Sequence, residues 1–141
     1  MFVMSASMTV KEAAWHHPEL GGDILFGEKT NENAADVFSS RAFRCLLQAC
    51  RRDYDVVLID TPPVLLVPDA RVIGQHADAI LYTVRWDKTR ERQVTTGLRA
   101  FQKVGLNVDG LVLSQVSPKE MKRYGYGQDY GTYAAAGYYD N

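Results

Sequence analysis

The stretch that decides the fold is Tyr54-Asp55-Val56-Val57-Leu58-Ile59-Asp60-Thr61-Pro62-Pro63. Its aliphatic run is continuous rather than alternating, a pattern typical of a strand that is covered on both faces in a parallel sheet. The two prolines cannot donate to a ladder, so we expect the strand to end before them. Ligands of open α/β sheets bind at the carboxyl ends of strands, which makes Asp60 the best single candidate for a functional residue.

The segments around this run alternate between helical and strand periods. Four have a helical period, namely 9–17, 34–52, 69–76 and 89–104. Three more are predicted strands, namely 23–26, 79–84 and 108–116. The alternation predicts an α/β class with a mainly parallel sheet. We expect residues 1–118 to form this α/β domain and residues 119–141, which have few aliphatic side chains, to form a flexible, disordered tyrosine-rich tail.

Composition excludes several classes of protein. The 141 residues are 46% apolar and 23% charged with a net charge of −1, as in soluble globular domains. A net charge this close to zero argues against nucleic acid or anionic lipid as the main partner. No apolar run approaches the roughly 18 residues of a membrane helix, and the start lacks the basic region of a signal peptide. Cys45 and Cys50 are predicted core thiols rather than a disulfide or metal pair, because they lie on different faces of a predicted helix and the histidines show no metal-ligand spacing. Without a signal peptide or a disulfide framework, we expect a reducing compartment.

Two acidic residues are candidates for a magnesium site. In nucleotide-binding proteins, an aspartate at the position of Asp60 holds Mg²⁺, usually through a water, while the metal bridges phosphate oxygens. Many parallel strands end in an aspartate that serves only as a turn or cap residue, and the Asp-Thr-Pro-Pro order favours the magnesium role. For Asp69 two interpretations stay open: it caps its own helix, or it neighbours the magnesium site.

Several motifs together resemble one family. They are the stretch 54–63, Pro68-Asp69-Ala70, Ala77-Asp78-Ala79, Val84-Arg85-Trp86-Asp87-Lys88-Thr89 and a tyrosine-rich end. In this order they resemble the bacterial tyrosine autokinases (BY-kinases) of exopolysaccharide and capsule assembly, from about Thr9 to the last residue. The resemblance implies a P-loop NTPase-like domain, similar to the partition ATPases, that uses ATP and Mg²⁺.

The resemblance also implies residue roles and partners. Asp60 matches the Walker B aspartate that organises Mg²⁺. The tail tyrosines match a cluster that a neighbouring subunit phosphorylates within a ring, namely Tyr124, Tyr126, Tyr130, Tyr133, Tyr138 and Tyr139. The implied partners are other kinase subunits and an inner-membrane polysaccharide chain-length regulator, with no nucleic acid. The implied location is cytoplasmic, peripheral to the inner membrane through a partner or a missing region.

The chain departs from this family in one large respect. No Gly-x-x-x-x-Gly-Lys-Ser/Thr motif occurs in the 141 residues, and the second aspartate-bearing Walker motif is also absent. We therefore expect a carboxyl-terminal part of such a kinase, with an incomplete domain that begins after both motifs. Without the N–H cradle and the lysine, we expect this chain alone to bind neither ATP nor Mg²⁺ and to have no significant kinase activity.

The missing motifs also affect how the chain is expected to fold, and a separate difference in sequence affects the expected recognition of adenine. By resemblance they lie on strands that flank the run 54–60, so this run loses its neighbours. It then pairs with 79–84, with a partner chain or with the Phe2–Val10 segment, and the isolated chain is expected to be marginally stable or prone to aggregate. Relatives often have an asparagine that contacts adenine where Ser114 and Gln115 stand here, which puts adenine recognition in doubt.

The sequence therefore leaves two alternative functions. In the first, the chain is the carboxyl-terminal part of a tyrosine autokinase that regulates exopolysaccharide polymerisation or export. In the second, it is a non-catalytic phosphoacceptor or interaction module that docks on an intact kinase or chain-length regulator. The tail itself is either an unmodified, weakly sticky segment or a charge switch, because six phosphates would add about −9 to −12 charges.

Overall fold

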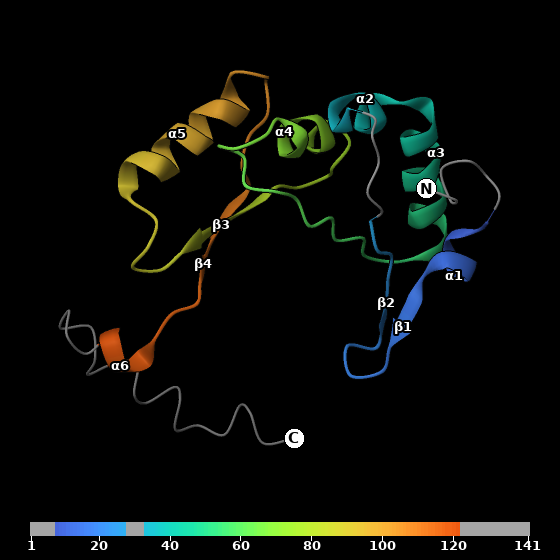
Figure 1. The fold of residues 1–141 in the computed structure, drawn as a ribbon, viewed down its shortest axis with the longest axis horizontal. Helices are drawn as coiled ribbons and strands as arrows, with labels where there is room; N and C mark the ends of the chain where they lie inside the picture. Colours follow the sequence, from blue (N-terminus) through green and yellow to red (C-terminus); the bar gives the residue numbers. More distant parts are fainter. Residues whose placement is uncertain (1–7, 28–32, 122–141) are drawn as a thin grey trace.

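The computed structural model describes residues 8–27 and 33–121 (Figure 1). Its helices are α1 (Val10–Ala13), α2 (Ala34–Ser39), α3 (Arg41–Asp53), α4 (Asp69–Gly74), α5 (Glu91–Gln102) and α6 (Pro118–Met121). Its strands are β1 (Trp15–His17), β2 (Gly22–Ile24), β3 (Leu81–Arg85) and β4 (Gly110–Ser114). The predicted α/β class is confirmed. The predicted start of the flexible tail at residue 119 is wrong, because residues 119–121 belong to α6, and residues 122–141 lie outside the described ranges.

A parallel pair of strands forms the carboxyl-terminal part of the fold. β3 pairs with β4 from Leu81 opposite Gly110 to Arg85 opposite Ser114, and α5 connects them in the chain. The predicted strands 79–84 and 108–116 are thus confirmed in shorter form. Within the described ranges the parallel sheet consists of these two strands alone, since the other sheet, β1 and β2, is antiparallel. The mainly parallel sheet expected from the sequence is therefore reduced to one pair.

Helix α5 packs on β3 through aromatic residues. The rings of Tyr82 and Phe101 meet edge to face with centroids 6.3 Å apart, and Phe101 is only 4% exposed. Gly97 permits this approach, because a Cβ there would collide with the Tyr82 hydroxyl. Beyond the end of α5, Gly105 adopts a φ of +76°, which favours glycine. The predicted helix 89–104 is confirmed within two residues at each end.

The amino-terminal segment confirms one prediction and corrects another. The capping box predicted from Thr9 is present, with its backbone N–H donating to Glu12 Oε2 over 2.8 Å. Helix α1 nevertheless ends at Ala13, and the prediction of a helix to residue 17 is wrong. Residues Trp15–His17 form β1 instead because they pair with β2 across a turn that contains Gly21 at a φ of +59°.

The helix predicted over 34–52 is divided in two at Ser40. This residue is extended, and its hydroxyl oxygen accepts a hydrogen bond from the Phe43 N–H over 3.1 Å, which starts α3. Phe43 and Leu47 of α3 pack with Ile73 of α4 in a small core. Of the two predicted core thiols, Cys50 is buried, whereas the prediction for Cys45 is wrong because it lies on the exposed side of α3.

The prediction of a strand at 54–60 is wrong, because these residues form no strand in the structure. After Tyr54 the chain runs between α3 and α4 without joining either sheet of the described structure (Figure 1). The next buried residue along the chain is Val64, which packs with Ala70 and Phe101. The sequence pattern was that of a doubly covered strand, but a strand requires a neighbour for its backbone groups. Neither 79–84 nor another described segment supplies one.

Candidate functional site

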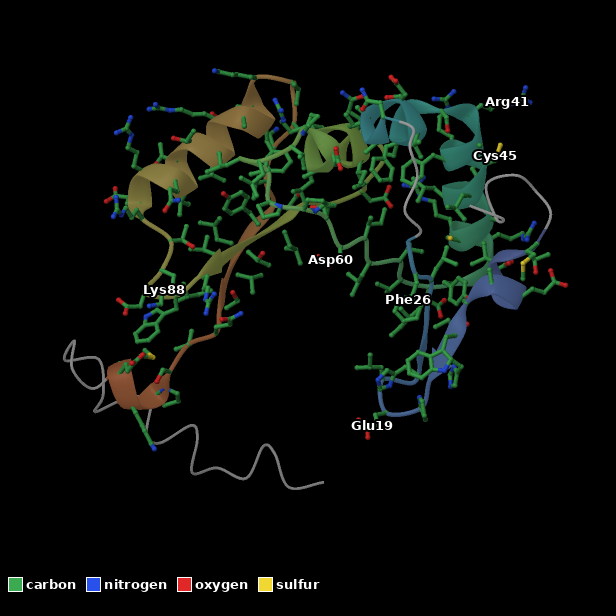
Figure 2. All side chains as sticks on the ribbon, in the orientation of Figure 1. Glu19, Phe26, Arg41, Cys45, Asp60 and Lys88 are labelled. Carbon is green, nitrogen blue, oxygen red and sulfur yellow. The ribbon has the colours of Figure 1, made fainter. Side chains whose placement is uncertain are left out.

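Asp60 ends an exposed aliphatic segment. The residue is exposed, and Figure 2 shows it on the connection between α3 and α4. Nowhere in residues 8–27 or 33–121 do three or more His, Cys, Asp or Glu side chains gather as a metal site would require. Mg²⁺ is commonly held by one or two carboxylates together with waters and substrate phosphates. The role of Asp60 as a Mg²⁺ ligand therefore stays a prediction, since the described residues form no cluster of three or more such side chains around it.

The segment that carries Asp60 is anchored at both ends. On its carboxyl side, Leu66 N–H donates to the Pro63 carbonyl over 2.9 Å, and Val64 between them is buried. On its amino side, the Tyr54 hydroxyl donates to Asp23 Oδ2 over 2.7 Å. These anchors fix where the segment starts and ends and leave its middle exposed.

Tyr54 belongs to a cluster that the sequence pattern did not reveal. The Asp23 carboxylate accepts from Tyr54 and also contacts His16 Nδ1 at 2.7 Å. The hydrogen bond from Tyr54 and then that from His16 hold the pKa of Asp23 below its usual value. The same bond raises the pKa of Tyr54 to about 12. Tyr54 and Asp23 are 31 positions apart in sequence, so no local motif could have predicted the contact.

Asp69 is buried at the start of α4, with 8% of its surface exposed. The cap position of this helix is Pro68, and α4 has no side-chain cap bond. The interpretation of Asp69 as a helix cap is therefore wrong, although an acidic residue in the first turn suits the helix dipole. Its place beside a magnesium site remains a prediction.

The carboxyl ends of β3 and β4 form the edge where α/β proteins bind ligands. Trp86 N–H donates to the Ser114 carbonyl over 2.9 Å, and the Ser114 hydroxyl donates to the Val84 carbonyl over 3.4 Å. Each strand is followed by a residue in left-handed conformation, Asp87 at a φ of 54° and Gln115 at a φ of 56°. The doubt over adenine recognition by Ser114 and Gln115 stays a prediction.

Asp60 lies apart from this edge. Figure 2 shows Lys88 on the loop after β3 and Asp60 on the separate connection between α3 and α4. The described structure therefore does not gather the predicted Asp60 with the basic residues that follow β3. The predicted phosphoacceptors all lie outside the described ranges, namely Tyr124, Tyr126, Tyr130, Tyr133, Tyr138 and Tyr139.

The sequence is similar to curated bacterial kinases. The tyrosine-protein kinase wzc of Salmonella typhimurium is 37% identical over 111 residues, which are 79% of this chain and 15% of the relative. The tyrosine-protein kinase ptk of Acinetobacter johnsonii is 32% identical over 106 residues, or 74% of this chain and 14% of the relative. No family model matches the sequence.

The fold agrees with this similarity. The crystal structure of the VpsO kinase domain superposes with a TM-score of 0.74 at 26% identity, over 82% of this chain and 57% of that domain. The chain is homologous to the bacterial tyrosine-protein kinases. It spans about one seventh of the length of the curated relatives, and it matches part of a kinase domain. The family and the fold predicted from the sequence are thereby confirmed.

None of the helices in the parts of the chain that the structure describes is long and apolar enough to cross a membrane.

Proposed function

We propose that this chain works as the carboxyl-terminal part of a protein-tyrosine autokinase that regulates exopolysaccharide polymerisation or export. The observation that carries the proposal is the homology itself, which covers 79% of the chain in a named tyrosine kinase and 82% in a solved kinase domain. The proposed partners are other kinase subunits, arranged in a ring, and a polysaccharide chain-length regulator. The proposed location is the cytoplasmic side of the inner membrane, reached through a partner.

In the complete domain, Asp60 is proposed to hold the Mg²⁺ that accompanies ATP. The exposed position of this residue, on a segment anchored at Tyr54 and Val64, supports this role. Phosphoryl transfer depends on phosphate positioning and on charge stabilisation by many groups together. A lone carboxylate supplies little of either, so the chain by itself is proposed to be an acceptor of phosphate rather than a kinase.

The tail tyrosines are the proposed acceptors. Each phosphate adds roughly −1.5 to −2 charges at pH 7. The chain now has a net charge of −1, so phosphorylation of several tyrosines would make it strongly anionic. Copies of the tail would then repel one another, which gives phosphorylation a direct effect on ring assembly.

A transfer assay tests the proposal. The full chain is incubated with the VpsO kinase domain, ATP and Mg²⁺, and phosphotyrosine is mapped by mass spectrometry. We expect phosphate on the tail in the wild type and in Asp60→Ala, and loss of label in a variant with phenylalanine at all six tail tyrosines. Label on Tyr54 or Tyr82 alone, or equal labelling without added kinase, would contradict the proposal.

The second candidate is a non-catalytic interaction module. The observation that favours it is that the described residues contain no group of three or more His, Cys, Asp or Glu side chains that could hold a metal ion. Calorimetry with ADP and Mg²⁺ separates the two functions for the assembled protein. Heat of nucleotide binding that is lost in Asp60→Ala supports the function as part of a kinase. A complex with an intact kinase that binds no more nucleotide than the kinase alone supports the interaction module.

A further inference from the structure

The outer side of α5 carries three cations in a row, which we call the basic face. Arg92, Arg99 and Lys103 are exposed, and their spacings of seven and four residues place them within about 40° of one another around the helix axis. The buried residues Gly97 and Phe101 lie on the opposite side, which packs on β3. Figure 2 shows side chains with nitrogen ends that extend from α5 away from the sheet.

The basic face has no acidic partner among the described residues. The ion pairs within the described structure involve His16, Arg51 and Arg52, all of which lie outside α5. Glu91 is the only acidic residue of this helix, and its position is about 80° or more away from the three cations around the axis. Three like charges within about 16 Å of helix create a positive potential that attracts anions. The basic face therefore suits an anionic ligand.

The narrow shape of the basic face favours an extended anionic chain over a flat anionic surface. Its cations form a single line along the helix, and the whole protein has a net charge of −1. Along the axis, Arg92 and Arg99 are about 10 Å apart. Phosphate groups three residues apart on an extended chain are also separated by about 10 Å. Arginine binds phosphate with two parallel hydrogen bonds, which makes such a match specific.

The tyrosine-rich tail has this spacing and begins close to α5. Tyr130 and Tyr133 are three residues apart. Arg85 pairs with Ser114 at the carboxyl ends of β3 and β4, so α5 and α6 both follow from the same edge of the sheet (Figure 1). The nine residues from Met121 to Tyr130 can span up to about 30 Å, whereas α5 is about 18 Å long. The tail is therefore long enough to reach the basic face of its own chain.

We infer that the basic face of α5 binds the phosphorylated tail, residues 122–141, of the same chain. The inference rests on the proposed function, because the tail must first receive phosphate. Without phosphate these residues include two basic and two acidic side chains, so their net charge is zero and the basic face does not attract them. Phosphates on Tyr130 and Tyr133 add about −3 to −4 charges. Docking then withdraws the tail from neighbouring subunits.

A peptide assay tests the docking. The probe is a fluorescent synthetic peptide of residues 122–141 with phosphate on Tyr130 and Tyr133, added to the full unphosphorylated chain and followed by fluorescence anisotropy. We expect saturable binding that weakens with added salt, and no binding of the peptide without phosphate. A peptide with phosphate on Tyr138 and Tyr139 has the same charge at a different spacing and should bind more weakly. Arg92→Gln with Arg99→Gln should weaken binding of the probe by about tenfold or more.

Lys11→Gln with Arg41→Gln is the matched control. It removes the same charge from exposed positions on α1 and α3, and Figure 2 shows Arg41 at the other end of the molecule from α5. This variant should bind the probe as the wild type does, and circular dichroism verifies that both double variants fold.

Four results of the peptide assay would overturn the inference. They are absence of binding, equal loss of binding in the two double variants, equal affinity for the two phosphopeptides, and binding to phosphatidylglycerol vesicles, but not to the probe, that requires the two arginines of α5. The last result would indicate a membrane surface as the ligand instead.

A second measurement tests whether the tail docks on its own chain. The chain is first phosphorylated on its tail by the VpsO kinase domain, and it should then bind the probe more weakly than the unmodified chain, because its own tail occupies the basic face. Unchanged affinity for the probe would contradict docking within one chain. The probe already carries its phosphates, so a tail that the kinase does not label would contradict the proposed function and leave the peptide assay to decide this inference.

Discussion

Two runs of this chain have nearly the same character, and only one of them is a strand. Val56–Ile59 and Leu81–Val84 are both short and rich in strand-forming residues. The second run lies in β3 because α5 returns the chain to place β4 beside it. The first run has no such neighbour in the described ranges and remains unpaired (Figure 1). The difference shows that β-propensity describes a fit to a neighbouring strand rather than an intrinsic backbone preference.

The largest expected effect comes from breaking the paired region. Phe101→Ala removes a side chain that is 4% exposed and supports Tyr82 and Val64. Such a truncation costs about 3–5 kcal/mol of unfolding free energy. We expect a large fall in the urea midpoint, measured by circular dichroism. A midpoint unchanged from the wild type would mean that α5 does not stabilise β3.

A smaller effect is expected at the contact between α5 and β3. Gly97→Ala places a Cβ against the Tyr82 ring, which is held in turn by Phe101. Overpacking of this kind costs about 1–3 kcal/mol. Tyr82→Phe in the same chain removes the nearest colliding atom, so the double variant should recover part of the loss. Full additivity of the two substitutions in thermal unfolding would contradict the collision.

A pH effect is expected where the unpaired segment is anchored. The pKa of Tyr54 is raised to about 12 from 10.0, so its contribution to stability is complete below pH 10 and is lost as the pH rises through 12. The pKa of Asp23 is lowered from 3.8, so its contribution is present above that value and is lost as the pH falls further. We expect the β1–β2 hairpin to stay attached to α3 between about pH 4 and pH 10.

Absorbance titration measures this effect. Tyr54 should ionise near pH 12 in the wild type, and this transition should be absent in Tyr54→Phe, whereas the pKa of Tyr82, which burial raises, should stay the same in both. Asp23→Asn should return the Tyr54 pKa toward 10, because the carboxylate that accepts its proton is removed. An unchanged titration curve in Asp23→Asn would show that the hydrogen bond does not form in solution.

The smallest expected effect is in the unpaired run itself. Leu58 is 87% exposed, so Leu58→Ala removes almost no buried surface. We expect a change in unfolding free energy within about 0.5 kcal/mol. Together with Phe101→Ala, this variant gives the sharpest form of the comparison between the two runs. A loss of several kcal/mol would show that Leu58 is buried by an element outside the described ranges.

How far the sequence predicts the fold depends on how local each interaction is. The capping box of Thr9 and Glu12, helix α5 and the end of α3 follow from patterns within a few residues, and all three are confirmed. The break at Ser40 was missed because the apolar stripe continues across it, although a serine three residues before Phe43 is a visible cap signal.

The candidate site shows the same division. Asp60 was identified from the run that precedes it, and the structure confirms that its segment lacks a neighbour within the described ranges. The separation of Asp60 from Lys88 could not be predicted from spacing. The cluster of His16, Asp23 and Tyr54 was invisible in the sequence, because its members meet only after the hairpin folds against α3.

By itself, the sequence determined the family, the α/β class and the helices whose apolar stripes and caps are encoded within single turns. Only the tertiary structure decided that Trp15–His17 is a strand, that Cys45 is exposed and that Val56–Ile59 is unpaired. The physical reason is that a helix satisfies its own backbone groups, whereas a strand depends on a neighbour that can lie anywhere in the chain or in another molecule.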